Sequence, residues 1–194
     1  MKDSQINLES MEIDYAKLSG RGGSFLIIPI DQGSVFSREQ FTEEHKMFQK
    51  TAREFGINRI LPVREELNVL NKTLSLEIFK EMGALGFHGV DVPEEYGGLA
   101  LDKTTACIIV EAMSSGQNAS IIVTASAHTG IGMLPIIWYG SEEQKKKYLP
   151  KLTSGEWMGC YSLTESGAGS DALSGTTTAK LNKEGTHYLL NGQK

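Results

Sequence analysis

The sequence contains little cysteine and proline, and it lacks a basic tract. Its 194 residues include 2 cysteines and 5 prolines, and 19 basic against 24 acidic side chains give a net charge of -5. Two cysteines in a chain of this length do not form a disulfide framework, which favours a reducing compartment. A negative charge without a basic stripe argues against nucleic acid as a partner.

The N-terminus has no apolar run of signal-peptide length, and the apolar stretch Ser24–Ile30 is too short to span a bilayer. We therefore expect a cytoplasmic protein. The four histidines (His45, His88, His128 and His187) lie far apart and lack the spacing of metal ligands, so no metal site is expected.

The chain divides into three predicted regions. Residues 1–36 have no helical period and form an extension, in which the apolar stretch is expected to act as an anchoring arm. Residues 37–156 have apolar side chains at helical spacing, which predicts a helical domain. The predicted helices cover residues 37–56, 74–85, 103–114, 119–138 and 141–152.

Polar residues mark three of these helix starts. Ser37 with Gln40, and Ser141 with Gln144, have the spacing of capping boxes, and Asp102 is placed to cap the third helix. In the second helix, the period predicts inward-facing Leu76, Phe79, Met82 and Leu85.

The fourth predicted helix, residues 119–138, is apolar nearly all round, which is typical of a helix in the centre of a bundle. Gly130 and Gly132 weaken it, so a break is expected there. His128 is expected to be a hydrogen-bonded core or interface histidine.

After Gly155 the hydrophobic pattern changes to that of strands, which are predicted at residues 157–164, 176–181 and 187–190. Asn191-Gly192 is a hairpin turn signal close to the end of the sequence. We therefore expect residues 157–194 to be the opening of a β domain whose remainder is absent.

Between two of these strands lies the polar segment YSLTESGAGSD, residues 161–171. Thr164, Ser166 and Ser170 offer hydroxyls, and the backbone N–H groups of Gly167–Ser170 could bind an anion such as phosphate. On composition alone, a solvated β-bulge loop is the better interpretation.

One nucleotide-binding motif and one hydrolase motif are both absent from this segment. The G-x-G-x-x-G pattern is broken because Ala172 occupies the third glycine position, and no G-x-S-x-G surrounds either serine.

The segment MGCYSLTESGAGSD, followed by TTTAKLNKEGTHYLLNGQK, resembles the signature of the acyl-CoA dehydrogenase family. The upstream motifs VPEEYGG, AHTGIG and GSEEQKKKYLPKLTSGEW agree with it and fall in the family's order. The resemblance extends from about Phe41 to Lys194. The GGSFLI arm and the AH-x-x-IG helix resemble the longer, very-long-chain-like members.

The resemblance implies a mainly α fold: an N-terminal acyl-CoA dehydrogenase-like helical domain followed by the truncated start of a β-barrel-like middle domain. It implies FAD as cofactor, an acyl-CoA substrate and electron-transfer flavoprotein as acceptor, with a homo-oligomer at full length. The implied reaction is α,β-dehydrogenation of an acyl-CoA thioester to the 2-enoyl-CoA, in fatty-acid β-oxidation.

By position, Tyr161, Leu163 and Thr164 correspond to the family's flavin-contacting strand. Gly169 and Ser170 correspond to the turn near the FAD phosphates, where Ser170 also lies near the acyl-CoA.

The sequence departs from the family pattern at Ser166, where many members have proline, which makes the turn less rigid. The family's aromatic-Ile-Thr/Ser-Asn segment and its glutamate base are expected beyond Lys194. No catalytic residue is therefore expected in this chain, which should be inactive alone.

Two alternatives remain open at this point. One is an acyl-CoA oxidase or another flavoprotein of the same superfamily. The other is a non-catalytic helical binding module, in which the polar segment only connects domains.

Overall fold

The structure, a computed structural model, describes residues 14, 17, 23, 26–29 and 36–194. Its contacts divide the chain into two units, Met1–Lys46 and Met47–Lys194, and each is described by itself. The expected anchoring arm, Ser24–Ile30, lies partly outside the described residues and stays a prediction.

The first unit contains the 3-10 turn η3 (Arg38–Gln40) and the start of α2 (Glu43–Phe55). The Ser37 N–H donates to the Gln40 side chain at 2.9 Å, but this box opens η3 and not the long helix that was predicted from residue 37. The helix begins after Thr42, whose hydroxyl accepts the His45 N–H at 3.1 Å. A side-chain acceptor for a free N–H sets the start of a helix.

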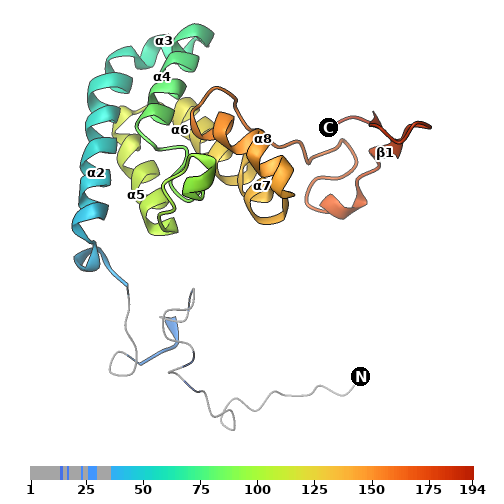
Figure 1. Ribbon diagram of the computed structural model, residues 1–194. Coiled ribbons are helices and arrows are strands. Elements are labelled where there is room, and N and C mark those ends of the chain that lie inside the picture. The colour runs from blue at the N-terminus through green and yellow to red at the C-terminus, as the bar shows by residue number, and fades with distance from the viewer. Residues whose placement is uncertain (1–13, 15–16, 18–22, 24–25, 30–35) are drawn as a thin grey trace. The chain divides into compact units, whose positions relative to one another are not determined.

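The second unit is mainly helical, which confirms the predicted fold class. Beyond α2 come η4 (Gly56–Ile60), η5 (Leu61–Val63), α3 (Arg64–Asn68), α4 (Lys72–Ala84), η6 (Glu94–Tyr96), α5 (Lys103–Met113), η7 (Ser114–Gly116), α6 (Ala119–Ala127), η8 (His128–Gly132), α7 (Leu134–Tyr139) and α8 (Glu142–Thr153). Figure 1 shows α3 to α8 gathered into one helical domain.

Two of the predicted caps are confirmed. Asp102 Oδ1 accepts the Thr105 N–H at 2.8 Å at the start of α5. Ser141 Oγ accepts the Gln144 N–H at 3.2 Å, and the Gln144 side chain accepts the Ser141 N–H at 2.8 Å. Both caps satisfy N–H groups that have no partner inside the helix.

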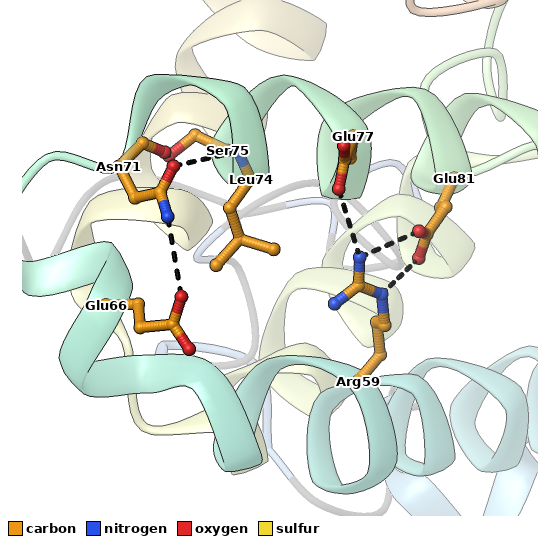
Figure 2. Close-up of polar contacts among 7 residues, drawn as sticks. All are labelled: Arg59, Glu66, Asn71, Leu74, Ser75, Glu77 and Glu81. Carbon is orange, nitrogen blue, oxygen red and sulfur yellow. Dashed lines mark hydrogen bonds and ion pairs between the residues drawn. The ribbon is translucent and has the colours of Figure 1, made fainter.

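Asn71 closes the turn between α3 and α4 (Figure 2). Its Oδ1 accepts the Leu74 N–H at 3.2 Å, and its side-chain nitrogen donates to Glu66 at 3.4 Å. Its backbone carbonyl accepts the Ser75 hydroxyl at 2.9 Å. One side chain therefore caps α4 and ties it to α3.

Arg59 joins η4 to α4 in the same view (Figure 2). Its Nε and one terminal nitrogen donate to the two carboxylate oxygens of Glu81 at 2.7 and 2.9 Å, and Glu77 lies 4.0 Å away. This two-bond geometry fixes the orientation of both side chains.

Buried apolar side chains form two clusters. The first cluster contains residues of α2, η4, α3, α4, α5 and α6 and of the loop that follows α4. Its members are Ala52, Ile60, Leu67, Ile78, Met82, Phe87, Val90, Ile109, Ala112, Met113, Ile121 and Ala125. The second cluster joins the η6 region to α8 and to the residue between η8 and α7. Its members are Val92, Tyr96, Met133, Leu149 and Leu152.

The predicted inward face of α4 is half right. Phe79 and Met82 are buried as predicted, but Leu76 and Leu85 are 42% and 41% exposed. Ile78 is fully buried in place of Leu76, because Ile78 and Met82 are one turn apart and share the face toward the first cluster. Leu85 lies beyond the last helical residue.

The predicted helix over residues 119–138 is broken where its glycines suggested. It consists of α6, the π turn η8 and α7. Among the described residues, Ala119–Tyr139 is the one helical run long and apolar enough to cross a membrane, judged by length and composition. Its side chains at Ala125, His128 and Met133 are buried in the helical domain.

The prediction that this helix lies in the centre of a bundle is wrong for one face. The side chains of Val123, Ile131, Trp138 and Tyr139 are 64%, 48%, 61% and 85% exposed. An apolar composition cannot distinguish a helix buried on all sides from one whose second apolar face is left open.

Two short strands follow α8 and the 3-10 turn η9 (Ala172–Ser174). They are β1 (Thr178–Leu181) and β2 (Tyr188–Asn191), paired antiparallel with Thr178 opposite Asn191. The turn lies at residues 182–187, and Asn191, which was assigned to a turn, is the last residue of β2. The strand predicted at residues 157–164 is wrong: this part is irregular, because no described segment pairs with it.

Candidate functional site

The segment that follows α8 is attached to the helical domain by His128. The Gly159 N–H donates to His128 Nδ1 at 2.8 Å, and His128 Nε2 lies 3.0 Å from the Leu152 carbonyl. Because Nδ1 accepts, Nε2 carries the proton and donates to that carbonyl. His128 is fully buried, so the predicted hydrogen-bonded core histidine is confirmed.

Close backbone packing adds to this attachment. A Cβ at Gly132, the last residue of the π turn η8, would lie 2.9 Å from the Gly159 carbonyl carbon. Only glycine allows such an approach. The π turn therefore brings both His128 and Gly132 against Gly159, two residues before the polar segment. This fits the tendency of π turns to occur at functional sites.

A second histidine packs against the first. The His88 ring centroid lies 4.7 Å from that of His128, and His88 Nε2 is 2.8 Å from the Phe79 carbonyl. Burial lowers the pKa of His88 to about 4, with a further contribution from the charge of His128. Burial also lowers the pKa of His128. Both rings are therefore neutral at neutral pH, as a buried pair requires.

All five predicted contact residues lie at the surface. The side chains of Tyr161 and Leu163 are 50% and 41% exposed, and Thr164, Gly169 and Ser170 are exposed as well. The Thr164 and Ser170 hydroxyls make no hydrogen bond to the described part of the chain. These groups are therefore free to meet a ligand.

A two-residue turn separates the predicted flavin-contacting residues, which end at Thr164, from the predicted phosphate-contacting residues, Gly169 and Ser170. Glu165 and Ala168 exchange two backbone hydrogen bonds of 3.1 Å, which close a turn over Ser166 and Gly167. Ala168 is 2% exposed, so the turn is fixed on its inner side.

No sequence pattern singled out Glu165, whose side chain is 6% exposed. One of its oxygens accepts the Thr176 N–H at 2.6 Å and the Thr176 hydroxyl at 3.0 Å. The other accepts the Thr177 N–H at 3.1 Å and lies 2.7 Å from Lys194 Nζ. The Lys194 ammonium first, then the threonine donors, hold the pKa of Glu165 well below its usual range.

The turn has room for a phosphate. Gly167 and Gly169 have no heavy atom within 4 Å of the position that a Cβ would occupy, so their backbones can be approached closely. The available donors therefore suit a phosphorylated cofactor such as FAD.

A groove of about 530 Å³ lies beside the attachment point, between α4 and α6. Its lining includes Leu67, Leu76, Ile121, Thr124 and Met158. Met158 precedes Gly159 directly, so one end of the groove lies three residues before the start of the polar segment. Its size and mainly apolar lining suit a small-molecule site.

Comparison with known proteins identifies the family. The model of the acyl-CoA dehydrogenase N-terminal domain matches residues 42–156. The chain therefore belongs to the acyl-CoA dehydrogenase family.

Individual relatives agree. A probable acyl-CoA dehydrogenase of Bacillus subtilis (strain 168) is 48% identical over 174 residues, covering 90% of this chain and 29% of that protein. A 3-(aryl)acrylate reductase of Clostridium sporogenes (strain ATCC 15579) is 39% identical over 156 residues, covering 79% of this chain and 40% of that protein. The chain thus spans less than half of the length of these relatives.

A solved structure is similar as well. The acyl-CoA dehydrogenase from Bacillus anthracis, complexed with FAD, has a TM-score of 0.81 and 52% sequence identity. The match covers 88% of this chain and 29% of that one.

Proposed function

We propose that this chain supplies the helical domain and one wall of the flavin and acyl-CoA site of an FAD-dependent acyl-CoA dehydrogenase. The reaction is α,β-dehydrogenation of an acyl-CoA thioester to the 2-enoyl-CoA, in fatty-acid β-oxidation. One observation carries the proposal: the family domain, residues 42–156, is followed by an exposed polar segment in which the Thr164 and Ser170 hydroxyls have no hydrogen-bond partner among the described residues. The FAD bound to the Bacillus anthracis relative supports the cofactor.

The residues of the polar segment take separate roles in this proposal. FAD, when bound, accepts a hydride from the acyl β carbon. Tyr161 and Leu163 would contact the flavin, and the Thr164 hydroxyl would donate to its pyrimidine side, which becomes more negative on reduction. The backbone N–H groups at Gly169 and Ser170 face the phosphates, and Ser170 also lies near the acyl-CoA.

The groove at Met158 is the proposed site of the acyl chain. It begins beside the residue that leads into the flavin-contacting segment, so an acyl chain lying there would present its thioester end toward that segment. Helix α6 contributes two hydroxyls to the groove, those of Ser120 and Thr124. Most of the other lining residues are apolar.

The base that removes the α proton is proposed to lie outside this chain, so the chain alone should have no dehydrogenase activity and should bind FAD weakly or not at all. Electron-transfer flavoprotein as acceptor, homo-oligomer formation at full length and a cytoplasmic location belong to the same proposal.

The test compares the purified chain with a chimera that joins it to the remaining part of the Bacillus anthracis acyl-CoA dehydrogenase. We expect a yellow chimera that an acyl-CoA bleaches without oxygen, and a colourless chain that reduces no artificial acceptor. Thr164→Val in the chimera should slow bleaching about a hundredfold, the typical effect of losing one donor to developing charge. Acyl-CoA turnover by the chain alone would contradict the proposal.

Two other functions give different results. A colourless chimera would favour a non-catalytic binding module. Flavin that returns to the oxidised state rapidly in air and forms peroxide would favour an acyl-CoA oxidase. The similarity to a 3-(aryl)acrylate reductase makes reduction of an acrylate a third outcome worth measuring in the same sample.

A further inference from the structure

The Glu165 carboxylate is enclosed by donors from two distant parts of the chain. Thr176 and Thr177 lie just before β1, and Lys194 follows β2. Together they direct four donor groups at the two carboxylate oxygens, so each oxygen has two partners. A carboxylate that is 6% exposed needs such partners, because burying an unpaired charge is costly.

Lys194 reaches a second acceptor in the same strip. Its Nζ lies 3.2 Å from the Leu163 carbonyl, in addition to the Glu165 oxygen. The ammonium therefore contacts the residues on both sides of Thr164, through the Leu163 carbonyl and the Glu165 carboxylate. A charged donor with two acceptors this close together restricts the backbone between them more than a solvent-exposed ion pair would.

Glycines leave room for this arrangement. A Cβ at Gly175 would lie 3.1 Å from the Glu165 Oε1, and one at Gly192 would lie 2.2 Å from the Thr177 Oγ1. A Cβ at Gly192 would clash with the Thr177 hydroxyl, and one at Gly175 would press on the Glu165 carboxylate, so both glycines favour this packing. The enclosure thus depends on several residues beyond the ion pair itself.

We propose that the Glu165–Lys194 ion pair is a positioning device that fixes the backbone of Leu163 to Ser170 from the far end of the β hairpin. Glu165 and Lys194 act here as positioning residues, because they hold the segment that carries Thr164 and Ser170. The proposal rests on the proposed function only for what this segment binds.

The test measures backbone amide exchange by NMR on the flavin-free chain. In Glu165→Gln and Lys194→Met, the amides of Ala168, Thr176 and Thr177 should exchange roughly tenfold faster or more, because their local structure opens more often. The amides of α5 should exchange at the parental rate. Lys194→Arg keeps the cation and should restore most of the protection.

Matched controls are Glu184→Gln and Lys180→Met, which remove one charge of each sign from exposed positions of the same hairpin. Neither should change exchange at Ala168. The double variant Glu165→Gln/Lys194→Met should be no more open than the more open single variant, because the two groups act as one unit.

Two results would overturn the proposal: parental exchange at Ala168, Thr176 and Thr177 in both single variants, or equal acceleration in α5, which would show general destabilisation. Lys194 is the more exposed partner, at 33%, so Lys194→Met keeps the test usable if Glu165→Gln does not fold. Since no flavin is present, failure here is separate from failure of the chimera to bind FAD.

Discussion

At the scale of single residues, His128 connects the helical domain to the polar segment. It accepts from Gly159 through one ring nitrogen and donates to Leu152 through the other, so only the neutral ring satisfies both partners. His88 packs against it and is neutral because it is buried. We therefore expect the attachment of the segment to depend on pH.

This gives a stability prediction. The unfolded chain binds protons at His88 and His128 near pH 6.5, whereas the folded chain binds them only at lower pH, about 4 for His88. Stability is therefore fully present above pH 6.5 and falls as the pH is lowered toward 4, by up to about 1.4 kcal/mol per pH unit and histidine. Urea unfolding between pH 7.5 and 4.5 measures the slope.

His88→Gln should flatten that slope, while His187→Gln in the exposed hairpin should leave it unchanged. An equal slope in the His88 variant and the parent chain would show that other groups cause the acid sensitivity.

The glycines of η8 give a matched pair of substitutions. Gly132→Ala places a methyl group 2.9 Å from the Gly159 backbone, whereas Gly130→Ala meets nothing within 4 Å. We expect Gly132→Ala to cost about 1–3 kcal/mol, as overpacking does, and Gly130→Ala to be neutral or stabilising by up to about 1 kcal/mol. Thermal or urea unfolding of both variants decides this; equal stabilities would contradict the close packing.

At the scale of elements, α4, α5, α6 and α8 each begin where a polar side chain caps them. Asn118 caps α6 by accepting the Ile121 N–H at 3.0 Å, and its side-chain nitrogen donates to Asn68 at 2.9 Å and to the Arg64 carbonyl at 3.3 Å. It is 2% exposed. One buried amide therefore both starts α6 and ties it to α3.

We expect Asn118→Ala to be more destabilising than Asn71→Ala. Loss of either cap costs about 1 kcal/mol, but Asn118 is buried, so its removal also strands polar partners, for about 1–3 kcal/mol more. Denaturant unfolding of the two variants measures the difference. Equal losses would mean that Asn118 acts only as a cap.

Local patterns predicted some of these elements and not others. Asp102 and the Ser141 box gave the starts of α5 and α8 because the acceptor and its target are three residues apart. Residues 157–164 were wrongly predicted as a strand, because strand-like composition says nothing about a pairing partner. The Glu165–Lys194 pair could not be predicted, because only the β1–β2 turn brings Lys194 back to Glu165.

At the scale of the whole second unit, burial is uneven. The helices carry both apolar clusters, whereas every residue of β1 and β2 is exposed. A two-stranded hairpin without a buried face is marginally stable in water. The polar segment therefore lies between a well-packed domain and a weakly held sheet.

Native-state hydrogen exchange should show this difference directly. We expect the amides of β1 and β2 to open with a much smaller free energy than those of α5, since local opening follows buried contacts. Increasing urea should leave the exchange of the strands nearly unchanged while accelerating α5. Protection of the strands equal to that of α5 would contradict an independent opening of the hairpin.

The π turn η8 also sets the angular register of the helical run. Each residue of an α-helix advances the chain by roughly 100° about the axis. Because the i→i+5 bonds of a π turn hold one residue more than an α-helical turn, deleting one residue from His128–Gly132 would let the run close as an α-helix and would remove the turn that brings His128 and Gly132 against Gly159. The turn should accept a substitution at Gly130 far more readily than a shortening, so the length of AHTGIG is the property that the fold needs.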